Sequence, residues 1–341
     1  MTTSHTLQAH HSVLGQDEEM TSATLLELHR PALTGHCYRM LGSLVDAEDA
    51  VQETMLRAWK AVDRFREQSS LKTWLYRIAT NVCLDLLSAA NKKPRVRPSD
   101  LTSEPAVVRE GMDLKQQPRE YWVEPIPDEL ALPAEEDSDP EERVILKESI
   151  RLAFVAALQY LPPRQRAVLL LTQVLNWSAA ETAEALEMSV AAVNSALQRA
   201  RATLEARNPA VVPRDLTAEQ EQLLERYAEA FERYDIDALT KLLHEEATMS
   251  MPPYELWLKG TGSIARWMLT YGIGCRGSKL VRLPSANGGA AVFAQYKNGG
   301  DVPWGVVVLE FDGERIGRIN YFLDVETIFP RFGVPMQLSA T

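Results

Sequence analysis

The chain has 341 residues, with 47 acidic and 36 basic side chains and a formal net charge of −11. This length exceeds one typical hydrophobic core, so two or three domains are expected. Apolar residues make up 45% of the sequence and charged residues 24%, which excludes an intrinsically disordered chain. An evenly spread acidic charge would also disfavour nucleic-acid binding, because nucleic-acid-binding proteins normally present basic surfaces.

Cysteine usage and the N-terminal sequence indicate the compartment. Cys37, Cys83 and Cys275 lie far apart, so neither a metal-binding cluster nor a disulfide framework is expected. Buried, reduced thiols of a cytoplasmic protein are the better interpretation. The N-terminus lacks the pattern of a secretory signal, and no apolar run has the length of a membrane span. We therefore expect a cytoplasmic protein with no metal, no cofactor and no membrane contact.

The negative charge is concentrated in one segment. Residues 98–142 hold 14 acidic and 3 basic side chains, a net charge of −11 that equals the charge of the whole chain. This segment is also rich in proline, so it is predicted to be an extended linker with little regular structure. Residues 20–97 carry a net charge of +4 and residues 143–207 a net charge of +3. Two mildly basic blocks therefore flank an acidic linker.

The first block, residues 20–97, is predicted to be helical. Apolar side chains recur there at spacings of three and four, namely Ala47, Ala50, Val51, Met55, Ala58, Trp59, Val62 and Phe65. The N-terminal end of this helix carries a cluster of negative charge, which suits the helix dipole: Asp46, Glu48, Asp49 and Glu53. On periodicity alone, a solvated helix start is the commoner explanation of such a cluster, and a binding surface is the alternative.

A second helix of this block begins near Ser70. Its apolar side is predicted to hold Leu71, Trp74, Leu75, Ile78, Val82 and Leu86, and its other side Lys72, Tyr76, Arg77 and Thr80. Trp74, Arg77 and Asn81 share one edge, because they are spaced by three and then four residues. Core packing of the tryptophan and a solvated basic face are the plain alternatives to a nucleic-acid surface.

The second block, residues 143–207, predicts a helix-turn-helix. Ser178 and Glu181 have the spacing of a capping box, and the short helix that they start ends near Glu187. Ser189 then caps a longer helix whose exposed side chains are small or polar: Ala192, Asn194, Ser195, Gln198 and Arg199. An ordinary helical hairpin remains the alternative.

Together, the two blocks resemble sigma-70-family RNA polymerase sigma factors of the extracytoplasmic-function type. The first block resembles the family's region 2 through Asp46-Ala-Glu-Asp49-Ala-Val-Gln-Glu53, Phe65 and Thr73-Trp-Leu-Tyr-Arg-Ile-Ala-Thr-Asn81. The second block resembles region 4 through Leu161-Pro-Pro-Arg-Gln-Arg166, Ser178-Ala-Ala-Glu-Thr-Ala183 and the stretch from Val193 to Arg199-Ala-Arg201. The resemblance implies an alternative sigma factor that binds core RNA polymerase, recognises the −10 and −35 promoter elements and initiates transcription.

The resemblance also implies roles for individual residues. The polymerase would bind Asp46, Glu48, Asp49 and Glu53. The −10 element would meet Phe65, Lys72, Trp74, Arg77 and Asn81, because melted bases need aromatic platforms and their backbone needs cations. The −35 element would meet Asn194, Ser195, Gln198 and Arg199. Further phosphate contacts are expected from Lys92, Lys93, Arg95, Arg97, Arg164 and Arg166.

Two features of the resemblance carry further expectations. Related sigma factors often have arginines on the recognition helix where this chain has Asn194 and Ala196, which predicts weaker −35 binding. The family's linker runs through the polymerase active-site cleft, so the acidic residues 98–142 could occupy a basic channel built for RNA, and a solvated tether is the alternative. The linker motif Tyr121-Trp-Val-Glu-Pro-Ile-Pro-Asp128 resembles one in large members with an additional C-terminal domain.

The C-terminal third, residues 215–335, is predicted to be an α+β domain. Helices are expected over 219–234, 237–244 and 264–271, with His244 on a helix. Strands are expected over 280–283, 290–297, 302–311 and 316–323, with Asn298-Gly-Gly and Asp312-Gly as turns. This order resembles the SnoaL-like (nuclear-transport-factor-like) cone, in which a curved sheet wraps around a helix and leaves an open pocket. The whole chain is thus expected to be two all-α domains, an acidic linker and this cone.

The cone raises the question of a ligand or a reaction. The candidate pocket residues are Met249, Met251, Tyr254, Trp257, Tyr296, Trp304, Tyr321 and Asp324. Asp324 is the one well-placed candidate acid, and no paired carboxylates, nucleophile motif or metal-ligand set stands out, so catalysis is not expected. A domain that regulates the sigma factor in cis, in place of a separate anti-sigma protein, is the preferred interpretation. A SnoaL-like enzyme with a DNA-binding part and a ligand-sensing transcription factor are the alternatives.

Overall fold

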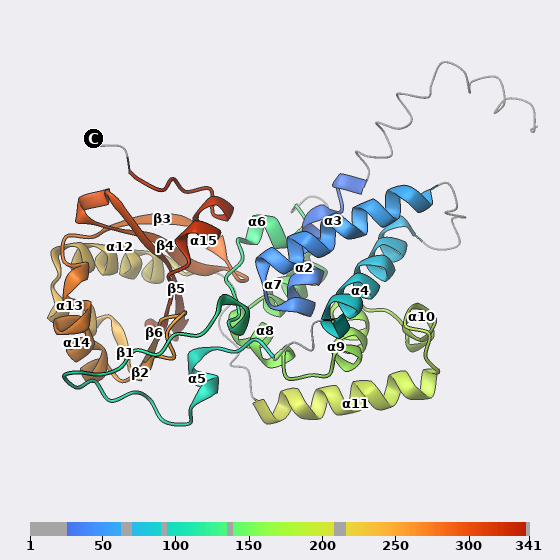
Figure 1. Cartoon of the computed structure of the whole chain (residues 1–341), viewed down its shortest axis with the longest axis horizontal. Coiled ribbons are helices and arrows are strands. Elements are labelled where there is room, and N and C mark those ends of the chain that lie inside the picture. The colour runs from blue at the N-terminus through green and yellow to red at the C-terminus, as the bar shows by residue number, and fades with distance from the viewer. Residues whose placement is uncertain (1–25, 63–69, 90–93, 135–138, 208–215, 339–341) are drawn as a thin grey trace, which may run out of the picture.

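The computed structural model describes residues 26–62, 70–89, 94–134, 139–207 and 216–338. Figure 1 shows the helices that precede residue 208 beside a C-terminal sheet, with part of the linker between them. The predicted fold class is confirmed: two helical domains, the second a helix-turn-helix, precede an α+β domain. No helix in the described ranges is long and apolar enough to cross a bilayer.

Within residues 26–62 and 70–89, the first domain contains the helices α2 (Arg30–Leu41), α3 (Leu44–Ala61) and α4 (Leu71–Ala89). Gly42 ends α2 with a φ of 70°, a conformation that glycine adopts without steric cost. Ser43 starts α3, because its hydroxyl accepts a hydrogen bond from the amide of Asp46 at 3.1 Å. The helices meet around fully buried small residues, including Cys37, Ala47 and Ala50.

The structure corrects which sides of these helices face the core. Trp59, predicted to lie inside, is 58% exposed. Tyr76 and Thr80, predicted to lie on the open side of α4, are buried because α2 packs there. His36 of α2 makes a 2.9 Å hydrogen bond with the Thr80 hydroxyl and packs edge-on against the Tyr76 ring. The simple one-sided pattern failed because α2, α3 and α9 all pack against α4.

The second helical domain contains α7 (Pro140–Ser149), α8 (Leu152–Leu158), α9 (Pro163–Leu169), the π-helical turn η4 (Leu170–Val174), α10 (Ala179–Ala185) and α11 (Val190–Arg207). The predicted capping box is present: Ser178 and Glu181 exchange side-chain and backbone hydrogen bonds at 3.2 and 2.8 Å. Ser189 caps α11 by accepting from the amide of Ala192. Glu187, with a φ of 52°, makes the sharp turn between α10 and α11.

The C-terminal domain is a six-stranded sheet with helices on both faces. Its helices are α12 (Ala218–Arg233), α13 (Ile236–Lys241), α14 (Thr261–Leu269) and α15 (Val325–Arg331), with short 3₁₀ turns η5 (Tyr271–Cys275) and η6 (Asn298–Gly300). Its strands are β1 (Leu243–Ser250), β2 (Trp257–Lys259), β3 (Lys279–Ala286), β4 (Ala290–Lys297), β5 (Val302–Asp312) and β6 (Arg315–Phe322). The strand order is β2-β1-β6-β5-β4-β3, and β1 and β6 are the parallel pair. Strands β1 and β2 were not predicted, and His244 lies in β1 instead of the predicted helix.

The two faces of the sheet belong to different cores. Val307, Leu309 and Tyr321 pack with α12, α13 and α14. Val306, Val308 and Phe322 pack with α15, in a cluster that continues into both helical domains. The α15 face is therefore the side through which the C-terminal domain joins the rest of the chain.

The linker has little regular structure but is firmly packed. It contains α5 (Pro98–Leu101), the 3₁₀ turn η2 (Arg119–Tyr121) and α6 (Asp128–Ala131). Trp122, Val123 and Ile126 are each at most 3% exposed. Burying large apolar side chains strongly favours this packed arrangement. In this form of the chain the linker is therefore not a solvated tether.

Candidate functional site

The acidic helix α3 presents one open face. Asp49 and Glu53 are exposed, and Glu53 forms a 2.7 Å ion pair with Arg57 one turn further on. Leu56 and Trp59, which are 47% and 58% exposed, extend this face with apolar surface. Large exposed apolar side chains beside charges are typical of a protein-binding surface. Periodicity alone could not show that Trp59 is exposed, because Trp59 fits the apolar repeat of the helix as well as a core residue does.

The other two acidic candidates are held by distant parts of the chain. Asp46 accepts a 2.8 Å hydrogen bond from Arg95, whose side chain is only 5% exposed. Glu48 forms a 2.8 Å ion pair with Arg331 from the end of α15. The C-terminal domain thus covers part of the acidic helix with a cation.

The candidate −10 residues lie on α4, apart from Phe65, which is outside the described residues. Trp74 is half-buried against the core, and Arg77 and Asn81 lie on the same edge of the helix. Lys72 makes a 2.7 Å ion pair with Glu142 at the start of α7. Arg77 lies 3.5 Å from Glu184 of α10. Carboxylates from the second helical domain thus face the two basic residues that are expected to contact DNA.

The helix-turn-helix presents its four candidate residues to solvent. Asn194, Ser195, Gln198 and Arg199 are all exposed on α11. Ala196, predicted to be a recognition position, is 3% exposed and packs in the core. A long side chain there would be excluded by packing, so Ala196 says nothing about the strength of −35 binding.

Two arginines expected to contact phosphates are instead internal. Arg166 is 3% exposed and donates to the carbonyl oxygens of Met40, Gln159 and Leu161. Burial lowers its pKa to about 9. Arg95 is buried beside Asp46 and also donates to the carbonyl oxygen of Trp122. These side chains join the helical domains and the linker, so they are unavailable to DNA in this form. Lys92 and Lys93 lie outside the described residues.

A turn of the C-terminal domain connects all the other parts of the chain. Asn287, at the turn between β3 and β4, is 2% exposed. Its side-chain amide donates to the Tyr38 hydroxyl at 2.9 Å and to the carbonyl oxygen of Ile150 at 3.0 Å. Its amide oxygen accepts from the backbone of Ile126 in the linker. One side chain therefore contacts the first helical domain, the second helical domain and the linker.

The next two residues of the turn bind an acidic side chain of the linker. The backbone amides of Gly288 and Gly289 donate to the two carboxylate oxygens of Asp128 at 2.7 and 2.8 Å. Burial raises the pKa of Asp128, an effect that these hydrogen bonds oppose. A Cβ on Gly288 would lie 2.1 Å from the carbonyl oxygen of Lys147, so only glycine permits this close approach of the backbones. Asn287-Gly288-Gly289 is a turn signal of the same kind as Asn298-Gly-Gly.

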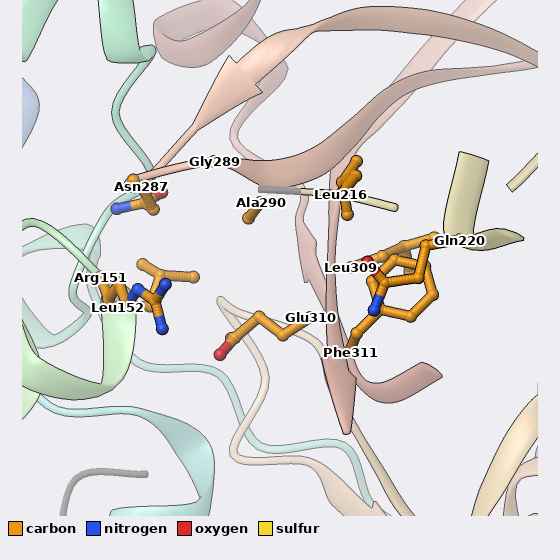
Figure 2. A pocket seen from close by; sticks show the side chains of 11 residues that line it. Arg151, Leu152, Leu216, Gln220, Asn287, Gly289, Ala290, Leu309, Glu310 and Phe311 are labelled. Carbon is orange, nitrogen blue, oxygen red and sulfur yellow. The ribbon is translucent and has the colours of Figure 1, made fainter. Parts of the chain in front are cut away.

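A small cavity lies beside this turn. Figure 2 shows Arg151 and Leu152 of the second helical domain facing Glu310 and Ala290 of the sheet across it. Its volume of about 40 Å³ suits one or two water molecules and is far too small for an organic ligand. The interface between these two domains is therefore closely packed, apart from this small cavity.

The eight candidate pocket residues do not share one cavity. Met249, Met251 and Tyr321 are buried in the core under α12–α14, and Trp257 donates a 2.9 Å hydrogen bond to Thr102 of the linker. Tyr296 lies on the opposite face and donates to the carbonyl oxygen of Pro335. A larger cavity of about 580 Å³ includes the remaining three, Tyr254, Trp304 and Asp324.

The linker occupies the space beside the helices of the cone. Val108 is 5% exposed and belongs to the core under α12–α14, with Ala106, Met112 and Leu114 packed against it. The Tyr271 hydroxyl accepts from the amide of Met112 and donates to the carbonyl oxygen of Arg109. The interior in which a SnoaL-like pocket was expected is thus lined with this chain's own linker.

Comparison with known proteins agrees with this architecture. Residues 25–93 match the family model of sigma-70 region 2, and residues 151–204 match that of sigma-70 region 4. The chain is 46% identical over 322 residues to the ECF RNA polymerase sigma factor SigG of Mycobacterium tuberculosis (strain H37Rv), covering 92% of this chain and 83% of that protein. It is 27% identical over 274 residues to SigJ of the same organism, covering 77% and 78% of the two chains.

A solved structure shows the same fold over nearly the whole length. The crystal structure of the Mycobacterium tuberculosis extracytoplasmic function sigma factor SigJ covers 92% of this chain and 99% of its own, with a TM-score of 0.56 and 19% identity. Regions 2 and 4 and the extent of the match to SigG agree with the motifs and the geometry described above. The chain belongs to the extracytoplasmic-function (ECF) family of RNA polymerase sigma factors.

Proposed function

We propose that this alternative sigma factor, which initiates transcription with core RNA polymerase at promoters, is held in a closed form by its own C-terminal domain. The observation that carries the proposal is the Glu48–Arg331 ion pair, because it places a cation of α15 on the helix expected to bind the polymerase. The Asn287 turn supports it by fixing regions 2 and 4 and the linker to the same domain.

In the open form, α3 binds the polymerase. Asp46, Glu48, Asp49 and Glu53 supply the negative charge, and Leu56 and Trp59 supply apolar contact. Complementary charge speeds association and orients the partners, while apolar burial keeps the complex together. In the closed form, Arg331 of the C-terminal domain is paired with Glu48, and Asp46 is paired with the buried Arg95, so Asp49 and Glu53 are the two carboxylates that remain exposed.

The surface expected to bind the −10 element is also partly covered in the closed form. Lys72, Trp74, Arg77 and Asn81, with Phe65, serve the −10 element, and Asn194, Ser195, Gln198 and Arg199 serve the −35 element. In the closed form Glu142 and Glu184 face Lys72 and Arg77, where DNA phosphates would otherwise lie. Release of region 4 from region 2 therefore both exposes the −10 surface and frees the two DNA-binding domains to span a promoter.

A regulatory role for the C-terminal domain fits its interior better than catalysis does. Met249 and Tyr321 are buried in an apolar core that also contains Val108 of the linker. An enzyme of this shape needs an acid or base beside an accessible substrate cavity under the helices. Asp324 lies elsewhere, at the start of α15. The C-terminal domain therefore acts as an inhibitor of regions 2 and 4 within the same chain.

Run-off transcription with core polymerase tests the proposal in the full-length chain. Arg331→Glu places like charges beside Glu48 and should increase transcript yield at limiting sigma concentration. Arg266→Glu on α14 makes the same charge change at an exposed site and should leave the yield unchanged. Equal yields from wild type and Arg331→Glu at every sigma concentration would show that this contact does not restrain the protein.

A further inference from the structure

The cavity of about 580 Å³ lies between the linker and the C-terminal domain. Arg119, Trp122 and Glu124 of the linker form one wall. Tyr254, Trp304, Phe322 and Asp324 contribute to the facing wall, along with several prolines. This volume is typical of sites that hold small organic ligands. A molecule bound here would touch the linker and the C-terminal domain at once.

The cavity is distinct from the interior of the cone. Phe322 belongs to the α15 face of the sheet, opposite α12–α14. Trp304 sits at a bulge of β5, since Gln295 pairs with Gly305 and Tyr296 pairs with Pro303. A bulge changes the direction of the side chain of the additional residue. Here that residue is Trp304, whose side chain lines the cavity.

The charges of the cavity wall cancel, apart from one carboxylate. Glu124 and Arg119 lie 3.3 Å apart, and Arg95, which lies 3.7 Å from the same Glu124 oxygen, is itself paired with Asp46. Asp324 is half-buried, and its carboxylate makes no hydrogen bond or ion pair with any residue that the structure describes. A half-buried carboxylate without such a partner is favourable for a positively charged ligand group.

We propose that this cavity binds a cationic aromatic molecule. Its ring lies against the aromatic and proline side chains, and its positive charge lies beside Asp324. Tyr254 and Phe322 offer rings on which the ligand can stack. The Trp304 ring already has the Lys297 ammonium 3.0 Å from its centroid, so Asp324 rather than a cation–π contact holds the charge of the ligand. Since both walls are present only when the linker is docked, the ligand binds the closed form more tightly and stabilises it. This regulatory consequence rests on the proposed function, whereas the binding does not.

Calorimetry on the full-length chain tests the site with tryptamine as the probe. Indole-3-propionate carries the same ring and a negative charge, so it serves as the matched ligand. We expect one tryptamine per chain, bound at least tenfold more tightly than indole-3-propionate. Asp324→Asn should weaken tryptamine binding about tenfold, a typical loss for one charged contact. Asp237→Asn, at an exposed position of α13, should leave it unchanged.

Three outcomes would overturn the proposal. They are no binding of tryptamine, equal binding of both ligands, and equal loss of affinity in Asp324→Asn and Asp237→Asn. A thermal unfolding midpoint of Asp324→Asn equal to that of wild type without ligand establishes that the variant is folded. Because this test measures binding and the test of the closed form measures transcription, failure of one is distinguishable from failure of the other.

Discussion

The guanidinium Nε of Arg331 lies 2.8 Å from a carboxylate oxygen of Glu48, across 283 residues of sequence. Glu48 belongs to the acidic helix of region 2, and Arg331 ends the last helix of the C-terminal domain. The pair is partly exposed, with side chains 26% and 39% accessible, so solvent weakens its contribution to stability. Its importance lies in its position, because it places a cation of the C-terminal domain on the helix that is expected to bind the polymerase.

The open face of α3 should determine polymerase affinity. Asp49→Lys reverses a charge on this face without disturbing the buried core, because Asp49 is exposed. We expect about tenfold weaker binding to core polymerase, mainly through slower association at low salt. Asp237→Lys changes the net charge equally at a distant exposed site and is the control. Equal association rates for the two variants would remove Asp49 from the interface.

The carboxylates of region 4 should compete with promoter DNA for the −10 surface. Glu142→Gln combined with Glu184→Gln removes the partners of Lys72 and Arg77. Both ion pairs are largely exposed, so we expect only about a two- to fivefold gain in affinity for a single-stranded −10 oligonucleotide. Fluorescence anisotropy measures this gain, which should shrink as salt is raised. A loss of affinity would mean that these carboxylates support the DNA-binding surface.

Asn287 should be a major contributor to stability. Asn287→Ala leaves the Tyr38 hydroxyl, the Ile150 carbonyl and the Ile126 amide without their present partner in a buried site. We expect a loss of about 3 kcal/mol in the free energy of unfolding, measured by urea titration.

The matched control for this loss is Asn298→Ala. Asn298 also has a positive φ, 54° against 49° for Asn287, but lies exposed in a hairpin turn. Its substitution reports only the backbone cost of alanine in this conformation, about 1 kcal/mol. Equal losses for the two variants would show that the hydrogen bonds of Asn287 add nothing.

His36 should make stability depend on pH. Burial, helped by the nearby charge of Arg39, lowers its pKa from an ordinary 6.5 to about 3. The unfolded chain takes up a proton as the pH falls below about 6.5, whereas the folded chain remains unprotonated until about pH 3. The free energy of unfolding should therefore decrease as the pH is lowered through this window. The decrease corresponds to at most about a tenfold rise in the unfolding equilibrium constant per pH unit.

The contribution of His36 is measured as a difference between proteins. In His36→Gln the midpoint of urea denaturation should depend less on pH between 6.5 and 5, a range above most carboxylate titrations. Glutamine keeps a polar group within reach of the Thr80 hydroxyl. Parallel pH profiles for wild type and His36→Gln would contradict the assignment.

Local features of this protein could be predicted from sequence because they depend on neighbouring residues. The Ser178–Glu181 capping box and strands β4, β5 and β6 follow from short patterns of side chains. The candidate recognition residues of α11 were likewise placed correctly on its exposed face. The helical period and the position of the cap suffice for such predictions.

The contacts between domains could not be predicted in this way. Arg95 and Arg166 have the appearance of surface cations in the sequence, and only long-range partners explain their burial. Val108 looks like a residue of a polar linker, yet it packs in the core of a domain more than 100 residues away. Such contacts depend on tertiary arrangement, which no local periodicity encodes.

If the C-terminal domain competes with the polymerase for α3, weakening its contact with that helix should tighten polymerase binding. An equilibrium titration of fluorescently labelled full-length chain with core polymerase measures this for wild type, Arg331→Glu and Arg266→Glu. We expect about fivefold tighter binding for Arg331→Glu at low salt and no change for Arg266→Glu, because Arg331 contacts the acidic helix and Arg266 does not. Binding of Arg331→Glu that is equal to or weaker than that of wild type would contradict this competition.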